Sequence, residues 1–381
     1  MRRLSILSLV AVAAALCSCK VHVATPRPAV PIVREIVADK ENPSHRLLKG
    51  QLPSAKEGSV FIIGEPKEVV ALTDAFLCAD RFDNASSRAI PDGLPDFSGE
   101  CFSGILDETG APYAALLAQD DGTLLRELCV RDVLAALDTT CYLSPYDLEG
   151  GMRKAPAKVL ILASSCMAAY GQFDVDTLFQ QMGCRIPVLS PLQCMLDEIF
   201  GQVDGDFNLG VLTDRANLSS GIYSSLFSYR CHQKGLKASA CTVLAPRDSS
   251  DLLTGFFDDY IASGVRGKLN YLIVDEPGQD VDALYERVDA LLSVMNPESL
   301  QYRGSIADDL KILVPDDCVL RQCYALMRER GLFSFRIAHP RAEAFLTTPS
   351  LIPYSDRYAA PLTVQAIESA PEKTRSFYVQ D

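Results

Sequence analysis

From residue 158 onward the chain alternates between short apolar runs and longer amphipathic segments. Runs of strand length, such as KVLILASS and LNYLIVDEP, are followed by segments with helical spacing, such as FDVDTLFQQMG and VDALYERVDALLSVM. Strands that are mostly apolar and are separated by helices are typical of parallel sheets covered on both faces. The alternation therefore predicts an α/β fold, and its last expected strand, LFSFRIAHP, ends at residue 340.

The segment before residue 158 is less regular. Residues 60–64 predict a strand, and residues 68–82 and 124–138 have the spacing of helices. A loop rich in proline, glycine and aspartate occupies residues 83–100. Residues 101–119 fit either a hairpin or two separate strands.

The chain is long enough for two domains of ordinary size. We expect two lobes with mainly parallel sheets flanked by helices, an N-terminal one over residues 58–205 and a C-terminal one over residues 206–340. Residues 341–381 are expected to form an irregular tail that could pack back. Residues 19–57 contain scattered prolines and no sustained apolar period, which predicts a tether.

The first residues resemble the leader of bacterial lipoproteins. Arg2 and Arg3 precede an apolar run over residues 4–16, which is too short to cross a bilayer and is typical of a secretory signal. The sequence LCSC, which ends at Cys19, resembles the lipobox. This resemblance implies that residues 1–18 are a signal peptide and that Cys19 carries acyl chains such as palmitate. An ordinary secretory signal cleaved nearby is the alternative.

A lipid anchor implies the bilayer as a partner and a location in the cell envelope. Lys20 follows the cysteine, and in Gram-negative lipoproteins that resembles the pattern of outer-membrane proteins facing the periplasm. Because Arg2 and Arg3 would leave with the leader, the net charge of −13 would become −15. Such an acidic chain lacks the basic surface that nucleic acid requires, so we expect no nucleic-acid partner. The sequence identifies no protein partner.

The cysteines predict no metal site and no disulfide framework. Of 13 cysteines, 11 remain once the leader and the acylated residue are set aside, and an odd number cannot all pair within one chain. Cys318 with Cys323, or Cys231 with Cys241, could form a bridge in an oxidising compartment. The four histidines are dispersed, and the acidic residues of the 83–100 loop lack the spacing of a calcium loop. We expect neither a metal nor a cofactor.

Polar residues follow three of the predicted strands at the point where each strand ends. In an open parallel sheet, ligands bind at this edge. The amides at the start of a helix favour an anionic group, although the same serines and acids could simply cap helices. The candidate ligand-binding residues are Ser164, Ser165, Cys166, Asp214, Ser219, Ser220, Gly221, Asp275 and Glu276.

The second half of the chain resembles type I periplasmic solute-binding proteins. In NLGVLTDRANLSSGIYSSLF a strand leads into a helix that small polar residues open, and LNYLIVDEP is a later strand that ends in an acidic turn. The resemblance implies two lobes that close on a small polar or anionic solute. The main functional prediction is therefore a membrane-anchored, extracytoplasmic solute-binding lipoprotein rather than an enzyme.

The chain also resembles the aspartate/glutamate racemases, which need no cofactor. The run ILASSC places Cys166 where that family has its first catalytic cysteine, and the family uses two thiols on opposite faces of the substrate. The turn Val274-Asp275-Glu276 has no cysteine where the second is expected. A racemase-like enzyme that uses Cys166 is thus an alternative function, provided that its thiol has a depressed pKa. A non-catalytic scaffold lipoprotein is the third hypothesis.

Overall fold

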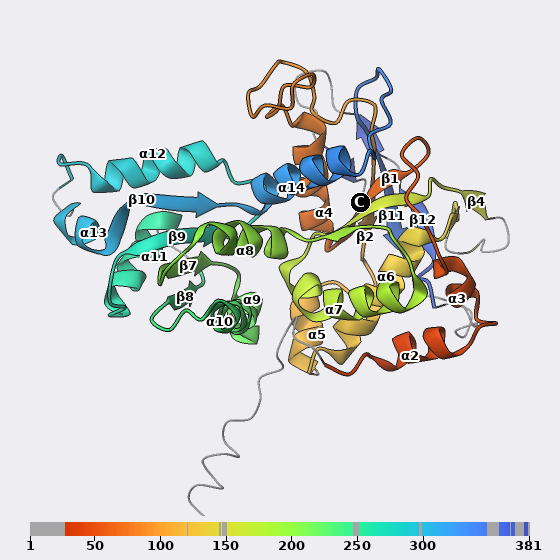
Figure 1. Ribbon diagram of the computed structural model, residues 1–381, viewed down its shortest axis with the longest axis horizontal. Coiled ribbons are helices and arrows are strands. Elements are labelled where there is room, and N and C mark those ends of the chain that lie inside the picture. Colours follow the sequence, from red (N-terminus) through yellow and green to blue (C-terminus); the bar gives the residue numbers. More distant parts are fainter. Residues whose placement is uncertain are drawn as a thin grey trace, which may run out of the picture.

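The chain forms two lobes that lie side by side, each built around a mainly parallel sheet (Figure 1). The computed structural model describes residues 27–379, apart from residues 120, 145, 147–150, 247–250, 297–298, 349–357, 366 and 370–376. The first sheet has the strand order β12-β11-β2-β1-β5-β6, and the second has the order β10-β9-β7-β8. The predicted α/β class, with two lobes of mainly parallel sheets flanked by helices, is confirmed.

The first sheet is buried at its centre. β1 pairs in parallel with β2 and β5, whereas β12 runs antiparallel to β11. Every residue of β1, β2 and β5 is buried, because helices cover both faces of a parallel sheet. The strands of this sheet are β1 (Ser59–Gly64), β2 (Cys101–Leu106), β5 (Ala157–Leu162), β6 (Val188–Leu189), β11 (Arg341–Thr347) and β12 (Leu362–Gln365).

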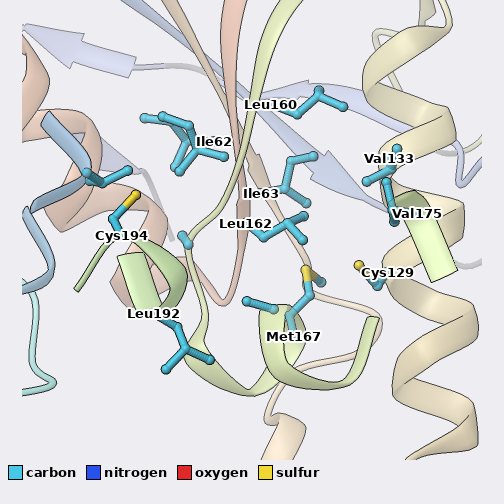
Figure 2. Close-up of a cluster of buried hydrophobic side chains, with 14 of the residues drawn as sticks. Ile62, Ile63, Cys129, Val133, Leu160, Leu162, Met167, Val175, Leu192 and Cys194 are labelled. Carbon is cyan, nitrogen blue, oxygen red and sulfur yellow. The ribbon is translucent and has the colours of Figure 1, made fainter. Parts of the chain in front are cut away.

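Helices lie on both sides of this sheet, so neighbouring side chains of β1 point into different layers. Figure 1 shows α4 and α14 on one side of the sheet and α6 and α7 on the other. Ile62 lies toward Cys194 of α8, whereas Ile63 lies toward Val133 of α6 and Val175 of α7 (Figure 2). The helices are α4 (Pro66–Cys78), α6 (Thr123–Leu137), α7 (Ser165–Met182), α8 (Pro191–Gln202) and α14 (Pro315–Glu329).

The helices α6 and α7 approach each other closely at Gly171. A side chain at this position would place its Cβ 2.3 Å from the Cβ of Cys129 in α6, so only glycine fits there. The close contact holds α7 against α6 and thereby fixes where its first turn, with Ser165 and Cys166, lies at the end of β5.

The second sheet separates two apolar cores. Leu209 and Val211 of β7 face a core that is continuous with the first lobe, whereas Leu212 belongs to a second core under α11, α12 and α13. This alternation follows from the two-residue repeat of a strand. The strands are β7 (Asn208–Leu212), β8 (Ala240–Leu244), β9 (Leu269–Val274) and β10 (Ile306–Leu313). The helices are α10 (Ile222–Lys234), α11 (Leu252–Ala262), α12 (Val281–Leu292) and α13 (Ser299–Ser305).

An aromatic cluster joins the two lobes. The ring centroid of Phe207, which precedes β7, lies 5.6 Å from that of Phe200 in α8, 5.5 Å from that of Phe227 in α10 and 5.4 Å from that of Tyr271 in β9. Aromatic rings at these separations bury large areas and attract one another edge to face. The apolar core of the first lobe therefore continues into the second without a break.

The segment predicted to be a tether is ordered from residue 31 onward. It forms α2 (Pro31–Ala38) and α3 (Pro43–Leu48), and Ile36 and Leu48 are fully buried in the core of the first lobe. Proline at the first helical position and apolar residues at helical spacing explain α2. The predicted signal peptide and the lipidation site Cys19 lie outside the described residues. Within those residues, no helix is both long and apolar enough to cross a membrane.

Three further expectations for local structure are wrong. Residues 111–119 hold the helix α5 (Tyr113–Gln119) rather than a strand, and residues 332–340 pair with no strand. The tail is not irregular throughout, because β11 pairs in parallel with β2 from Arg341 onward. Two small antiparallel pairs complete the fold: β3 (Thr140–Cys141) with β4 (Met152–Arg153), and β13 (Ile367–Ser369) with β14 (Phe377–Val379).

Candidate functional site

The ends of β1, β7 and β9 surround a pocket of about 360 Å³ where the two lobes face each other. Each strand end supplies acidic or hydroxyl side chains. Ligands of parallel sheets bind at this edge, so polar side chains are expected here. The end of β5 lies beside it and is linked to it by hydrogen bonds. The polar residues that line the pocket are Glu65, Lys67, Glu68, Thr213, Asp214, Asp275 and Glu276.

Asp275, after β9, connects the two lobes. Its Oδ1 accepts a hydrogen bond of 2.8 Å from Ser165 of the first lobe. Its Oδ2 accepts hydrogen bonds from the Thr213 hydroxyl at 2.9 Å and from the Asn217 amide at 3.2 Å. Burial raises the pKa of Asp275, and hydrogen bonds from Tyr223, Ser165 and Thr213 oppose the rise. Lys67 and Glu276 form a second contact between the lobes, with their charged atoms 3.0 Å apart.

Cys166 is buried beside this pocket and does not line it. Its side chain is 5% exposed, and its Sγ donates to Oδ1 of Asn217 at 2.7 Å. Burial raises the pKa of the thiol well above its ordinary value, and the carboxylates of Asp214, Glu68 and Asp275 add to the rise. Cys166 is therefore a neutral thiol near physiological pH and lacks the reactivity of a thiolate.

A second thiol is not brought to the site. Cys318, which lies after the turn where the second catalytic cysteine was expected, is fully buried in the first turn of α14, where its Sγ lies 3.5 Å from the guanidinium of Arg321. Burial raises its pKa as well, and the charge of Glu198 adds to the rise. None of the 11 cysteines from Cys78 to Cys323 forms a disulfide, so neither of the bridges considered from the sequence is present.

The helix after β7 has no free amides for an anion. Asp214 caps α9 (Arg215–Ser220), and its Oδ1 accepts from the backbone amides of Ala216 at 2.6 Å and Asn217 at 2.8 Å. Asp214 therefore acts as a helix cap, which was the alternative considered for these strand-end acids.

Three predicted site residues lie at the far end of α9. Ser219 and Ser220 donate to backbone carbonyls within the helix, at Arg215 and Asn217. Gly221 forms the left-handed turn, with φ of 68°, that joins α9 to α10. None of the three lines the pocket. The structure therefore brings together Ser164, Ser165, Cys166, Asp214, Asp275 and Glu276 at the lobe boundary, and leaves Ser219, Ser220 and Gly221 outside it.

Two glutamates in the site were missed from the sequence. Glu65 follows β1 and accepts a hydrogen bond of 2.6 Å from the backbone amide of Tyr113. Burial raises its pKa, which the neighbouring charge of Asp214 also favours. The strand VFIIG is followed directly by EPKE. Because polar residues at the ends of parallel strands are candidate ligand-binding residues, the reasoning that selected Asp275 could have identified both glutamates.

Glu68, in the first turn of α4, has a carboxyl group with one unpartnered oxygen. Its Oε2 is buried and has no hydrogen-bond partner among the described residues. Burial raises the pKa of Glu68 well above its ordinary value, and the charges of Glu65 and Asp275 raise it further, whereas a hydrogen bond from Ser164 lowers it. A buried carboxyl group under these influences keeps its proton at higher pH than an exposed one.

The pocket is strongly acidic. Five carboxyl side chains line it, and its one lining cation, Lys67, is paired with Glu276. This charge favours a cation over an anion in the pocket. Among the described residues, no group of three or more histidine, cysteine or acidic side chains could hold a metal ion.

Comparison with known proteins identifies solved structures of similar shape. No protein-family model and no curated protein matches the chain. A glutamate racemase from Bacillus anthracis matches with a TM-score of 0.45 and 12% identity, over 77% of this chain and 90% of that one. Glutamate racemases from Francisella tularensis (TM-score 0.41, 12% identity, 77% and 90% covered) and Campylobacter jejuni (0.41, 13%, 77% and 93%) are similar in the same way.

The main functional prediction is corrected by these findings. A solute-binding lipoprotein with a periplasmic-binding-protein fold was expected, whereas the solved structures that match are glutamate racemases. The acidic lining of the pocket also disfavours the anionic solute that was expected. No comparison bears on the lipobox, so acylation of Cys19 and the envelope location remain predictions.

Proposed function

We propose that the protein is an enzyme of racemase-like fold that moves a proton to or from a small substrate in the pocket between its lobes. The observation that carries this proposal is the carboxyl group of Glu68, which lines the pocket with one buried oxygen lacking a partner among the described residues. A general acid or base needs a pKa near the working pH and an unoccupied position facing the substrate. The raised pKa of Glu68 moves it toward the first condition, and Glu68 lines the pocket with its buried Oε2 left without a partner among the described residues.

The other carboxyl groups of the pocket have different roles. Asp275 is held by three donors and Glu65 by the amide of Tyr113, so both are oriented by the protein. Sites that combine fixed carboxylates with one whose pKa is much higher separate the roles of charge stabilisation and proton transfer. Glu68 would thus carry the proton, and Asp275 would stabilise positive charge on the substrate.

The thiol takes a positioning role in this mechanism. Cys166 donates to the side-chain oxygen, Oδ1, of Asn217. This hydrogen bond orients the side-chain amide of Asn217, whose Nδ2 donates to Asp275. A neutral thiol suits this hydrogen bond, whereas a thiolate beside these carboxylates is unfavourable. The proposed chemistry therefore differs from the two-thiol reaction that the racemase resemblance implies.

The proposed substrate is a small amine or amino acid without an acidic side chain. An ammonium group is attracted by the carboxylates of Asp214 and Glu276, while a second carboxylate on the substrate would be repelled. Dicarboxylic amino acids are for this reason expected to be poor substrates.

The experiment measures loss of a carbon-bound proton in D₂O by ¹H NMR. The full chain is incubated with amino acids and amines that carry basic, neutral or acidic side chains. We expect exchange with members of the first two groups, and a rate at least about 100-fold lower in Glu68→Gln, because general acid–base catalysis contributes that much. Glu57→Gln, an exposed glutamate outside the pocket, is the matched control.

Three results would contradict the proposal: exchange with none of these compounds, exchange with acidic amino acids alone, or an unchanged rate in Glu68→Gln. Cys166→Ser separates the thiol from the carboxyl group. The hydroxyl keeps the hydrogen bond to Asn217, so exchange should fall by less than about tenfold, whereas a thiol base would lose essentially all activity.

A further inference from the structure

A second pocket, of about 520 Å³, lies at the opposite edge of the first sheet. One wall is the loop that leads into the start of β2, and the other is the segment that leads into the start of β11. The pocket is therefore separated from the between-lobe site by the length of the strands, and none of its lining residues belongs to that site.

The second pocket is largely apolar, and part of this apolar surface is exposed. Tyr324 and Phe333 form its floor, with ring centroids 5.3 Å apart. Leu94, Phe335 and Ile337 form its rim and are 57%, 82% and 105% exposed. Large apolar side chains gathered around a hollow, rather than scattered singly, are typical of a binding site.

The wall that carries Phe335 is held rigidly. The amide of Gly99 donates to the carbonyl of Ala338 at 2.7 Å, and the Ser334 hydroxyl donates to the carbonyl of Gly99 at 3.0 Å. Gly99 has φ of 80°, and a Cβ there would lie 2.2 Å from the carbonyl oxygen of Arg336, so the two walls meet at a position that only glycine fits.

A buried ion pair lies behind the same wall. Glu100 accepts from the amide of Ser334 at 2.7 Å and pairs with Lys158, which donates to the carbonyl of Leu332 at 3.1 Å. Phe335 is one of two non-glycine residues with positive φ, at 54°, among the described residues. Such a backbone conformation costs energy and persists only where the surroundings impose it. The backbone at Phe335 is therefore held in place, and its phenyl ring lies exposed at the rim of the pocket.

The charge around the second pocket is positive. Arg328 and Arg336 line it, and the guanidinium of Arg328 lies 5.9 Å from the ring centroid of Tyr324. Arg328 has no carboxylate partner among the described residues. Asp96 is the acidic residue that lines the pocket, and its carboxylate accepts hydrogen bonds from the backbone amides of Arg81 and Phe82. An unpaired arginine above an aromatic floor is suited to a ligand that is both anionic and apolar.

We propose that this second pocket binds a small amphiphilic anion, an aromatic or acyl body that carries one carboxylate, sulfonate or phosphate group. The body packs against Tyr324, Phe333 and Phe335, and the anionic group lies at Arg328. The volume is in the range of pockets that enclose a single small ligand. This proposal is independent of the proposed proton transfer.

The test uses two fluorescent probes of nearly equal shape, anionic 8-anilinonaphthalene-1-sulfonate and neutral N-phenyl-1-naphthylamine, titrated into the full chain. Phe335→Ala should weaken binding of both probes about tenfold, as expected for an aromatic contact at the centre of a site. Arg328→Gln should weaken the anionic probe about threefold and leave the neutral one unchanged, as expected for an exposed ion pair. Probe that binds to apolar surface elsewhere contributes equally to the titrations of all variants. Differences in affinity between the variants therefore measure binding in the second pocket.

Two matched controls lie outside the pocket. Met295→Ala removes an exposed apolar side chain from the second lobe, and Arg330→Gln removes an exposed charge two residues after Arg328. Both should leave both titrations unchanged. Competition with decanoate indicates an acyl ligand and competition with 1-naphthoate an aromatic one. Displacement by neither compound, or unchanged probe binding in Phe335→Ala and Arg328→Gln, overturns the proposal.

Discussion

Cys166 illustrates how the surroundings of a residue decide its chemistry. At the end of a parallel strand and in the first turn of a helix, a cysteine has the position of a nucleophile. Here burial raises the pKa of the thiol, and the charges of four neighbouring carboxyl groups raise it further. The position is that of a catalytic cysteine, and the local environment removes its reactivity.

Cys166 is therefore expected to resist alkylation in the folded protein. Iodoacetamide at pH 8 should modify the exposed Cys78 readily and leave Cys166 unmodified until the chain is unfolded, because only an accessible thiolate reacts. Peptide mass spectrometry of the two cysteines measures this difference. Alkylation of Cys166 at neutral pH at the rate of Cys78 would show that its thiol is accessible and ionised.

Asp132 in α6 should make stability depend on pH. It is fully buried, its two carboxyl oxygens have no hydrogen-bond donor among the described residues, and burial together with the charge of Asp107 raises its pKa well above the ordinary value. The folded state then holds a proton that the unfolded chain releases above about pH 4. Stability contributed by the protonated form is complete below that pH and is lost as pH rises through the raised pKa.

Asp132→Asn should remove this loss. At pH 8 we expect the free energy of unfolding to rise by about 1–3 kcal/mol, the usual cost of an unsatisfied buried polar group, while the change at pH 4 should be smaller. Urea denaturation at several pH values measures the profile. Glu127→Gln, on the same helix, is the control and should follow the unmodified chain. Parallel profiles for Asp132→Asn and the unmodified chain would contradict the prediction.

At the scale of elements, the local sequence pattern correctly predicted the regular strand–helix units. It gave the wrong structure for segments whose conformation depends on strand pairing or on packing against distant helices. LFSFRIAHP alternates as a strand does, yet residues 332–340 remain unpaired because β2 takes β11 as its neighbour instead. Residues 113–119 form α5, although the sequence fits a strand, because this segment packs against α6 and α9. Short apolar runs fit either structure, and tertiary contacts choose between them.

The pair Lys158–Glu100 should hold β5, β2 and the segment after α14 together. Both side chains are fully buried, so removal of one leaves an uncompensated charge in the core. Lys158→Met should lower the free energy of unfolding by about 3–5 kcal/mol, measured by urea denaturation. The double variant Lys158→Met, Glu100→Gln should recover part of this loss. A double variant that is as unstable as the sum of the single changes would show that the two groups act separately.

At the scale of the molecule, the core of the first lobe continues onto one face of the second sheet, while the other face of that sheet has a core of its own. Phe207 is buried among Phe200, Phe227 and Tyr271, which come from both lobes, and α14 returns the chain to the first lobe. Because of this continuity we expect the two lobes to unfold together. The between-lobe pocket is therefore built on a rigid support.

Phe207→Ala should destabilise both lobes together. We expect a loss of about 3–5 kcal/mol, the range for a large aromatic side chain in a core, with one unfolding transition retained. Hydrogen exchange should increase to a similar extent in the amides of β1 and of β9. Ile337→Ala, which removes an exposed side chain, should change neither. Faster exchange confined to β9 would show that the lobes unfold independently.

The sequence alone determined the α/β class, the order of most strands and helices and the strand ends at which polar residues meet. These features depend on periodicity and on neighbours along the chain, which a sequence contains. Only the tertiary structure decided the protonation of Cys166, the buried carboxyl oxygen of Glu68 that has no partner among the described residues, and the return of β11 to the first sheet. Each of these depends on groups distant in the sequence, because burial, charge and strand pairing are set by which residues the fold places side by side.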